Sequence, residues 1–177
     1  GFDVTITDET EDLAALAVQG PTSCTSLTEM GLTDLNTLKP FGMRTYDFEG
    51  EKLMVSRTGF TGDLGYEVWV PPDSAEALWD QLFELGHDYL IKPIGGLALE
   101  LARIEAGFLQ ANTDFMPSED VVRVGRTRSP FELGLAWLVD FSKPLFNGRA
   151  ALLKEQANGS RFRFALLDVH GNKPAEH

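Results

Sequence analysis

The sequence has few of the residues from which disulfides, metal sites and membrane spans are built. Cys24 is its one cysteine, which excludes an internal disulfide and fits a reducing compartment. The three histidines, His87, His170 and His177, form no HxH or HxxxH pattern, so we expect no metal site. No apolar run reaches the roughly 18 residues of a membrane helix, and we expect no membrane partner.

Basic charge is also scarce. The chain of 177 residues has 15 Lys and Arg against 27 Asp and Glu, a net charge of −12. Nucleic-acid binding needs a basic footprint, so we expect no nucleic-acid partner. The short basic cluster Arg123, Arg126 and Arg128 is interpreted as a loop that could meet the anionic tail of a ligand. No signal peptide is visible, and we expect a cytoplasmic location, or the mitochondrial matrix in a eukaryote.

Alternating and periodic hydrophobicity predicts an α+β fold with antiparallel sheets and flanking helices, since several neighbouring strands are joined by hairpins. Helices are predicted where apolar residues recur at helical spacing between Pro or capping residues and Gly, with a capping box of Asp73 and Glu76. On the helix at 96–106, Leu97, Leu101 and Ile104 are expected to face inward. The predicted strands span 3–7, 13–18, 43–48, 52–57, 66–70, 133–139 and 161–169, and the other predicted helices span 21–30, 33–38, 73–86 and 150–157.

The segment SRTGFTGDLGYEVWV, residues 56–70, is the most informative part of the chain. Glycines at this spacing let the backbone adopt positive φ and approach another surface closely. A carboxylate just past such a loop, here Glu67, can accept two hydrogen bonds from a planar amidine-like ring edge. The spacing alone equally fits an ordinary hairpin turn with a solvated glutamate.

Other candidate groups have ordinary explanations. Glu100 and Arg103 stand three residues apart, which predicts an ion pair on the surface of a helix. The aromatic residues after position 107, among them Trp137, could wall a ring-binding pocket, although most aromatic side chains belong to a core.

Several segments in order resemble the T-protein (aminomethyltransferase) family of the glycine cleavage system. The most specific are the RTGxTGxxGxE loop and the RxEAG helix that follows it, and the resemblance covers nearly the whole chain. Its relatives include the folate-binding domains of dimethylglycine and sarcosine dehydrogenases, and folate-dependent demethylases. The segments are AVQGP (17–21), SRTGFTGDLGYEVWVP (56–71), LARIEAGF (101–108), PFELGLAWLV (130–139) and FNGRAALL (146–153).

The resemblance implies a folate-binding α+β domain over 1–130, the central part of the family fold. Residues 131–177 would continue it and begin the link to a C-terminal β-barrel that is absent here. It further implies tetrahydrofolate as the cofactor, a small-molecule one-carbon donor, and a carrier protein or further domains as partners. The family's catalytic carboxylate lies on a segment without a match, so no catalytic residue is assigned and the 177 residues alone are expected to be inactive.

The resemblance also carries over individual residues. Glu67 matches the glutamate that pairs with the amino-pyrimidine edge of the pterin, Phe60 matches a tyrosine that lines the pterin, and Trp137 is taken as part of the pocket wall. Leu99 and Ala111 stand where T-proteins carry an arginine and a tyrosine, which points away from glycine cleavage proper. We therefore expect a fragment of a tetrahydrofolate-dependent aminomethyl- or methyltransferase, a class that includes demethylase-like and dehydrogenase-linked relatives; the alternative is a non-catalytic folate-binding or regulatory module.

Overall fold

The computed structural model describes residues 3–168 and residue 171. The chain forms two compact units, one spanning residues 1–108 and the other 109–177. The boundary between the units along the chain therefore falls at the start of the segment 108–130, which the sequence predicts to be irregular. The domain boundary at residue 130 that the family resemblance implies stays a prediction.

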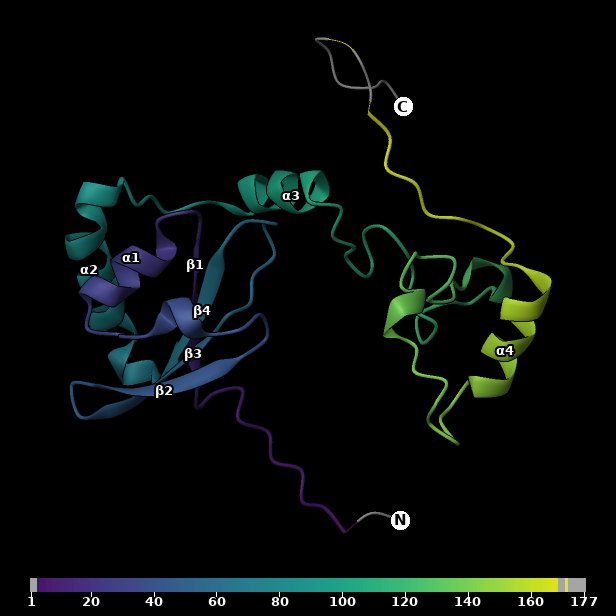
Figure 1. Ribbon diagram of the computed structural model, residues 1–177, viewed down its shortest axis with the longest axis horizontal. Coiled ribbons are helices and arrows are strands. Elements are labelled where there is room, and N and C mark those ends of the chain that lie inside the picture. The colour runs from purple at the N-terminus through teal and green to yellow at the C-terminus, as the bar shows by residue number, and fades with distance from the viewer. Residues whose placement is uncertain (1–2, 169–170, 172–177) are drawn as a thin grey trace. The chain divides into compact units, whose positions relative to one another are not determined.

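The first unit is built on an antiparallel sheet with strand order β1-β4-β3-β2 (Figure 1). Helices α1 and α2 pack against the sheet through β4 and β1. This arrangement confirms the predicted α+β class with an antiparallel sheet and flanking helices. The elements are β1 (Ala14–Gln19), α1 (Ser23–Glu29), η1 (Leu35–Thr37), β2 (Met43–Phe48), β3 (Glu51–Ser56), β4 (Gly65–Val70), η2 (Pro72–Ser74), α2 (Ala75–Gly86), η3 (His87–Tyr89) and α3 (Gly96–Glu105).

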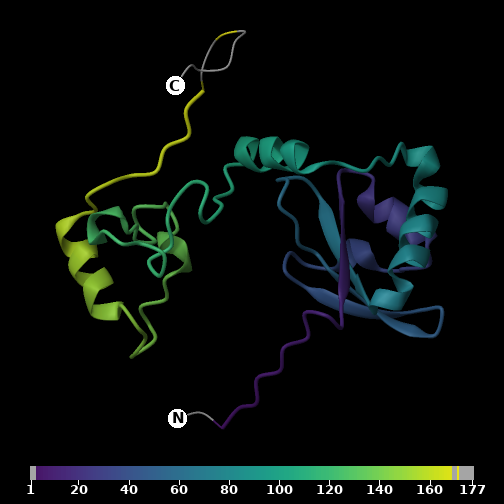
Figure 2. The same cartoon turned by 180° about the vertical axis from the view of Figure 1, so that it is seen from behind.

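The predicted hairpin is confirmed, and its turn shows why the sequence signal was strong. Glu49 and Gly50 both have positive φ, 54° and 86°, the conformation of a two-residue turn between right-twisted strands. The Gly50 N–H donates to Asp47 Oδ1 at 3.2 Å. β1, in contrast, pairs with β4 across a long stretch of sequence and lies at the edge of the described sheet (Figures 1 and 2).

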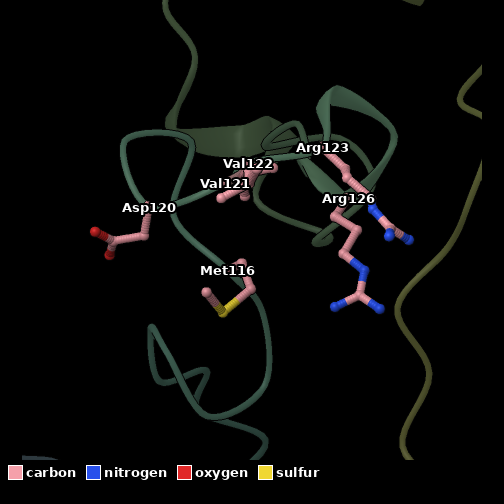
Figure 3. A pocket seen from close by; sticks show the side chains of 6 residues that line it. All are labelled: Met116, Asp120, Val121, Val122, Arg123 and Arg126. Atoms are coloured by element: carbon pink, nitrogen blue, oxygen red, sulfur yellow. The ribbon is translucent and has the colours of Figure 1, made fainter.

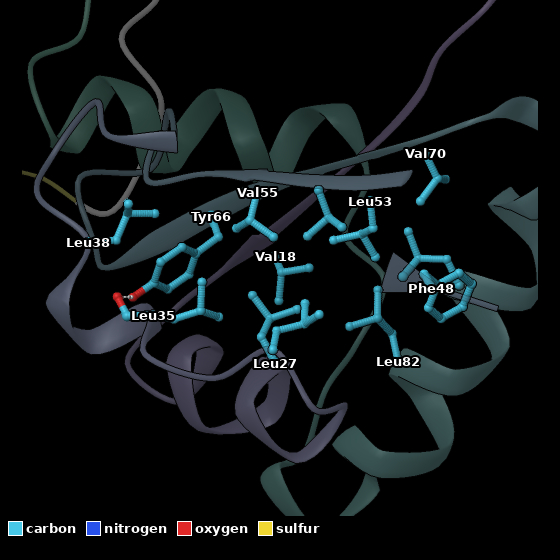
Figure 4. Packing of buried hydrophobic residues seen from close by; sticks show 13 residues of the cluster. Val18, Leu27, Leu35, Leu38, Phe48, Leu53, Val55, Tyr66, Val70 and Leu82 are labelled. Carbon is cyan, nitrogen blue, oxygen red and sulfur yellow. Dashed lines mark hydrogen bonds between the residues drawn. The ribbon is translucent and has the colours of Figure 1, made fainter. Parts of the chain in front are cut away.

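The core lies on the face of the sheet toward α1 and α2 (Figure 4). On β4, Tyr66, Val68 and Val70 point into it, so Glu67 and Trp69 point to the opposite face. The Tyr66 hydroxyl donates to the Leu35 carbonyl at 3.3 Å, and burial raises the pKa of Tyr66 to about 12. Cys24 is half-buried and packs against this core. The buried cluster is Val18, Leu27, Leu32, Leu35, Leu38, Phe48, Leu53, Val55, Tyr66, Val68, Val70, Leu78 and Leu82.

The expected orientation of α3 is wrong. Leu97, Leu101 and Ile104 are 85%, 64% and 44% exposed, whereas Arg103 is 1% exposed. Helical spacing tells which side chains share a face, but not which face meets the rest of the protein. The Arg103 guanidinium can be buried because it pairs with Glu100 and donates from Nη1 to the Phe108 carbonyl at 3.0 Å. The predicted ion pair therefore exists, but on a buried arginine.

Four further local predictions are wrong. Residues 3–7, 133–139 and the described part of 161–169 (161–168) form no strands, because alternation needs a neighbouring strand to pair with and none lies beside them in the described chain. The capping box at Asp73 does not form, since Pro72–Ser74 makes a 3₁₀ turn and α2 begins at Ala75 without a side-chain cap. Val169 lies outside the described residues.

The second unit contains η4 (Val124–Arg126), η5 (Ala136–Leu138) and α4 (Arg149–Asn158), the last of these as predicted. Its irregular segments are held by the buried Glu132. The Glu132 carboxylate accepts hydrogen bonds from the Ser129 N–H at 3.1 Å and from Arg161 Nε at 3.2 Å. The backbone carbonyl of Glu132 accepts a hydrogen bond from the Phe164 N–H at 2.7 Å. Burial opposes the charge, but the Ser129 and Arg161 hydrogen bonds outweigh it, and the pKa of Glu132 is lowered.

Candidate functional site

The glycine-rich loop after β3 is folded around one side chain from β1. Gln19 Nε2 donates to the carbonyls of Thr58 at 3.3 Å and Tyr66 at 3.1 Å, so it joins the two ends of the loop. Thr61 Oγ1 donates to Gln19 Oε1 at 3.4 Å. A methyl group on Gly59 or Gly65 would overlap the Gln19 amide. These two glycines are therefore needed for close approach, and not for positive φ.

Gly62, at the tip of the same loop, is needed for both reasons: its φ is positive, and its backbone lies close to another surface. Its φ is +79°, and a Cβ at this position would lie 2.5 Å from the Cβ of Ala106. The loop thus packs on the C-terminal end of α3. This contact brings together the RTGxTGxxGxE loop and the RxEAG helix, which are separate in the sequence.

Glu67 is half-buried on β4, between Ala17 of β1 and Ser56 of β3. Thr58 Oγ1 donates to Glu67 Oε2 at 2.6 Å, and Ser56 Oγ lies 3.4 Å from the same oxygen. The two hydroxyls are also hydrogen-bonded to each other at 2.7 Å. Oε1 accepts no hydrogen bond from the described residues. The carboxylate is thus held in place through one oxygen and offers the other.

Phe60 and Phe108 form an aromatic surface in the same unit. Their ring centroids are 5.6 Å apart with an interplanar angle of 15°, and each side chain is 38% exposed. Phe60 belongs to the glycine-rich loop, which leads into β4 and Glu67. Trp137 belongs to the second unit, where it lies in η5 and is 75% exposed.

Sequence reasoning missed the roles of Gln19 and Thr58, whereas Phe108 is one of the aromatic residues after position 107 that it named as possible walls of a ring-binding pocket. Gln19 stands in the AVQGP segment, but nothing in that segment tells that its amide fills the space left by two distant glycines. Thr58 likewise has no local signal, because its hydrogen bond to Glu67 depends on how the loop turns back. Leu99 is partly exposed on α3 and Ala111 is exposed in the second unit.

No group of three or more His, Cys, Asp or Glu side chains that could hold a metal ion occurs in residues 3–168 or 171. His170 and His177 lie outside the described residues.

In the described part of the chain, no helix combines the length and the apolar character needed to cross a membrane.

A family model and two known proteins each match most of this chain. The family model described as "GCVT N-terminal domain" matches residues 1–143. An aminomethyltransferase from Halothermothrix orenii is 35% identical over 172 residues, 97% of this chain and 46% of the relative. One from Pseudothermotoga lettingae is 30% identical over 176 residues, 99% of this chain and 46% of the relative. The chain thus spans about half the length of these relatives.

A solved structure shares the fold. The glycine cleavage system aminomethyltransferase T from Bartonella henselae superposes with a TM-score of 0.67 at 27% sequence identity. The match covers 83% of this chain and 37% of that protein.

Proposed function

This chain belongs to the GCVT N-terminal domain family, and we propose that it is the folate-binding part of a tetrahydrofolate-dependent aminomethyl- or methyltransferase. The observation that carries the proposal is the Glu67 carboxylate, fixed by Thr58 at 2.6 Å through one oxygen and without a hydrogen bond on the other from the described residues.

The donor set around Glu67 fits the polar edge of a pterin. The 2-amino-pyrimidine edge presents neighbouring N–H groups, which a carboxylate accepts. Because Thr58 and Ser56 hold Glu67, its orientation costs little entropy when a ligand binds. The face of the sheet that carries Glu67 is the one that α1 and α2 leave uncovered.

The aromatic side chains fit the flat faces of the same ring system. We propose Phe60, which stacks with Phe108, as one wall of the site. Trp137, which belongs to the second unit, stays a proposed ligand contact that rests on the family resemblance alone. Tetrahydrofolate, when bound, supplies the N5 amine that accepts the one-carbon unit. The residues of this chain would bind and orient the ring, and we assign none of them a catalytic role.

Leu99 and Ala111, where the family carries polar or aromatic groups, favour a one-carbon donor other than that of glycine cleavage. The same two residues are also compatible with a second candidate function, that of a folate-binding module without catalysis. We propose a small-molecule one-carbon donor, and a carrier protein or further domains, as the partners of the first candidate.

Calorimetric titration of the 177-residue chain with tetrahydrofolate tests the site. Replacing Glu67 with Gln keeps the shape but removes the charge, and we expect affinity to fall by about tenfold or more. The matched control is Glu51→Gln, which alters an exposed carboxylate on β3 of the same sheet. If Glu67→Gln binds as tightly as the unaltered chain, the assignment of Glu67 is wrong.

A transfer assay separates the two candidate functions. We expect the 177-residue chain to bind tetrahydrofolate without turnover. Binding that persists without transfer in every longer form of the protein would favour the non-catalytic module.

A further inference from the structure

The second unit contains a hollow that the proposed folate site does not use (Figure 3). Its volume is about 350 Å³, and Arg123, Arg126, Met116, Asp120, Val121 and Val122 line it. A neighbouring hollow of about 240 Å³ shares Met116 and Arg126 with it, and its other lining residues are Asn112, Thr113, Asp114, Phe115 and Arg128. Neither hollow is lined by Glu67, Phe60 or Trp137.

The backbone places Arg123 and Arg126 on the same side of the segment. The Arg126 N–H donates to the Arg123 carbonyl at 2.8 Å, which closes a 3₁₀ turn. With three residues per turn, side chains at positions i and i+3 lie one above the other. Figure 3 shows both guanidinium groups on the same side of the loop, with Met116 on the facing stretch of chain.

The side chains of Arg123 and Arg126 have no hydrogen-bond or ion-pair partner among the described residues, although the chain has 27 acidic residues. Asp114, an acidic residue that lines the hollow beside Arg126, makes no ion pair with Arg126 that the structure records. The Asp120 carboxylate is directed away from them in Figure 3. Like charges on one turn repel each other weakly at an exposed position, and a bound anion would relieve that repulsion.

Arg128 differs from this pair. Its Nη1 donates to the Thr127 carbonyl at 2.9 Å, and its guanidinium lies 4.5 Å from the centroid of the Phe162 ring. Arg128 is therefore engaged in holding the second unit together. Arg123 and Arg126 are the two members of the basic cluster that are available to a ligand.

We propose that Arg123 and Arg126 form a binding site for a small organic oxyanion, a carboxylate or a phosphate, with an apolar part. Two neighbouring guanidinium groups present parallel N–H donors to such a group. Met116, Val121 and Val122 provide the apolar contact. The site lies within one unit, so the proposal does not depend on folate binding at Glu67.

Calorimetric titration with phenyl phosphate, benzoate and inorganic phosphate tests the site and identifies the oxyanion. Phenyl phosphate and benzoate share the ring and differ in the anionic group, so the tighter of the two names the preferred chemistry. Inorganic phosphate lacks the ring and should bind more weakly than phenyl phosphate. We expect Arg123→Gln and Arg126→Gln each to weaken binding about tenfold or more, and added salt to weaken it as well.

Two control variants make the result decisive. Arg163→Gln removes an exposed arginine of the same unit outside the hollow, and Glu67→Gln alters only the proposed folate site; both should bind the probes as the unaltered chain does. The proposal is overturned if neither phenyl phosphate nor benzoate binds at millimolar concentration. It is also overturned if Arg123→Gln and Arg126→Gln bind as tightly as Arg163→Gln. Circular dichroism confirms that each variant is folded.

Discussion

Replacing Gly62 with Ala should destabilise the first unit through two separate effects. Gly62 has a φ of +79°, and a Cβ there would lie 2.5 Å from the Ala106 Cβ. The positive φ alone costs about 1–2 kcal/mol for a residue with a Cβ. The overlap requires the loop or α3 to shift, and overpacking of this kind costs about 1–3 kcal/mol. Together we expect a loss of about 2–5 kcal/mol in the free energy of unfolding.

The hairpin supplies a matched control. Gly50 has a similar φ of +86°, but nothing lies within 4 Å of the position of its Cβ. Gly50→Ala therefore measures the conformational cost without the contact, about 1–2 kcal/mol. The difference between the two variants reports the packing of the loop on α3.

Urea unfolding followed by tryptophan fluorescence measures these values. A Trp137→Phe background leaves Trp69 and Trp79 as reporters, both in the first unit. Adding Ala106→Gly to Gly62→Ala should restore about 1–2 kcal/mol, because it removes the Ala106 methyl group that the new Cβ at position 62 would overlap. If Gly62→Ala is no worse than Gly50→Ala, or if Ala106→Gly gives no relief, the inferred contact between the loop and α3 does not exist.

Three further predictions concern other contacts. Gln19→Leu should cost about 1–3 kcal/mol in urea unfolding, because the Thr58 and Tyr66 carbonyls lose their donor, and combining it with Gly65→Ala should be less than additive; full additivity would contradict the shared space. The pKa of Glu132 is lowered from its ordinary 4.5, so this residue stabilises the second unit above that pH, and the stabilisation is lost as pH falls through the folded pKa. Trp137 fluorescence during acid unfolding should therefore depend less on pH in Glu132→Gln, and an unchanged pH dependence would refute this role of Glu132. Ultraviolet titration should show one tyrosinate forming at about pH 12 that is missing in Tyr66→Phe, and the neutral phenol's contribution to stability should disappear as pH rises through that value.

Local signals predicted those elements whose stability is local. The hairpin at 43–56 and the helices that became α1, α2 and α4 follow from turn residues and periodicity within one segment. The apolar runs 133–139 and 161–168 failed because strand formation depends on a partner that short-range pattern cannot supply. The orientation of α3 failed for a related reason. Its apolar stripe suggested an inward face, while the charged Arg103 is the buried side chain.

The same difference between local signals and long-range contacts applies to the residues of the candidate site. Glu67 could be chosen from the sequence because its loop and strand are contiguous and the family resemblance names it. Gln19 could not, since its partners Thr58 and Tyr66 are 39 and 47 residues away. The Thr58 hydroxyl that holds Glu67 also depends on how the loop turns back, which is a property of the folded loop and not of a local sequence pattern.

The pairing of β1 with β4 has a consequence for how the site is assembled. The β2–β3 hairpin closes through a two-residue turn, whereas Ala14 pairs with Val70 and Gln19 with Gly65. Contacts between residues so distant in sequence form late in folding, because the loop must close before they contribute. We expect the Gln19 amide to enter its loop in the final step, so that the polypeptide acquires the geometry around Glu67 only when its edge strand docks. Pulsed hydrogen exchange should then show amides of β1 gaining protection after those of β2 and β3, and simultaneous protection would contradict this order.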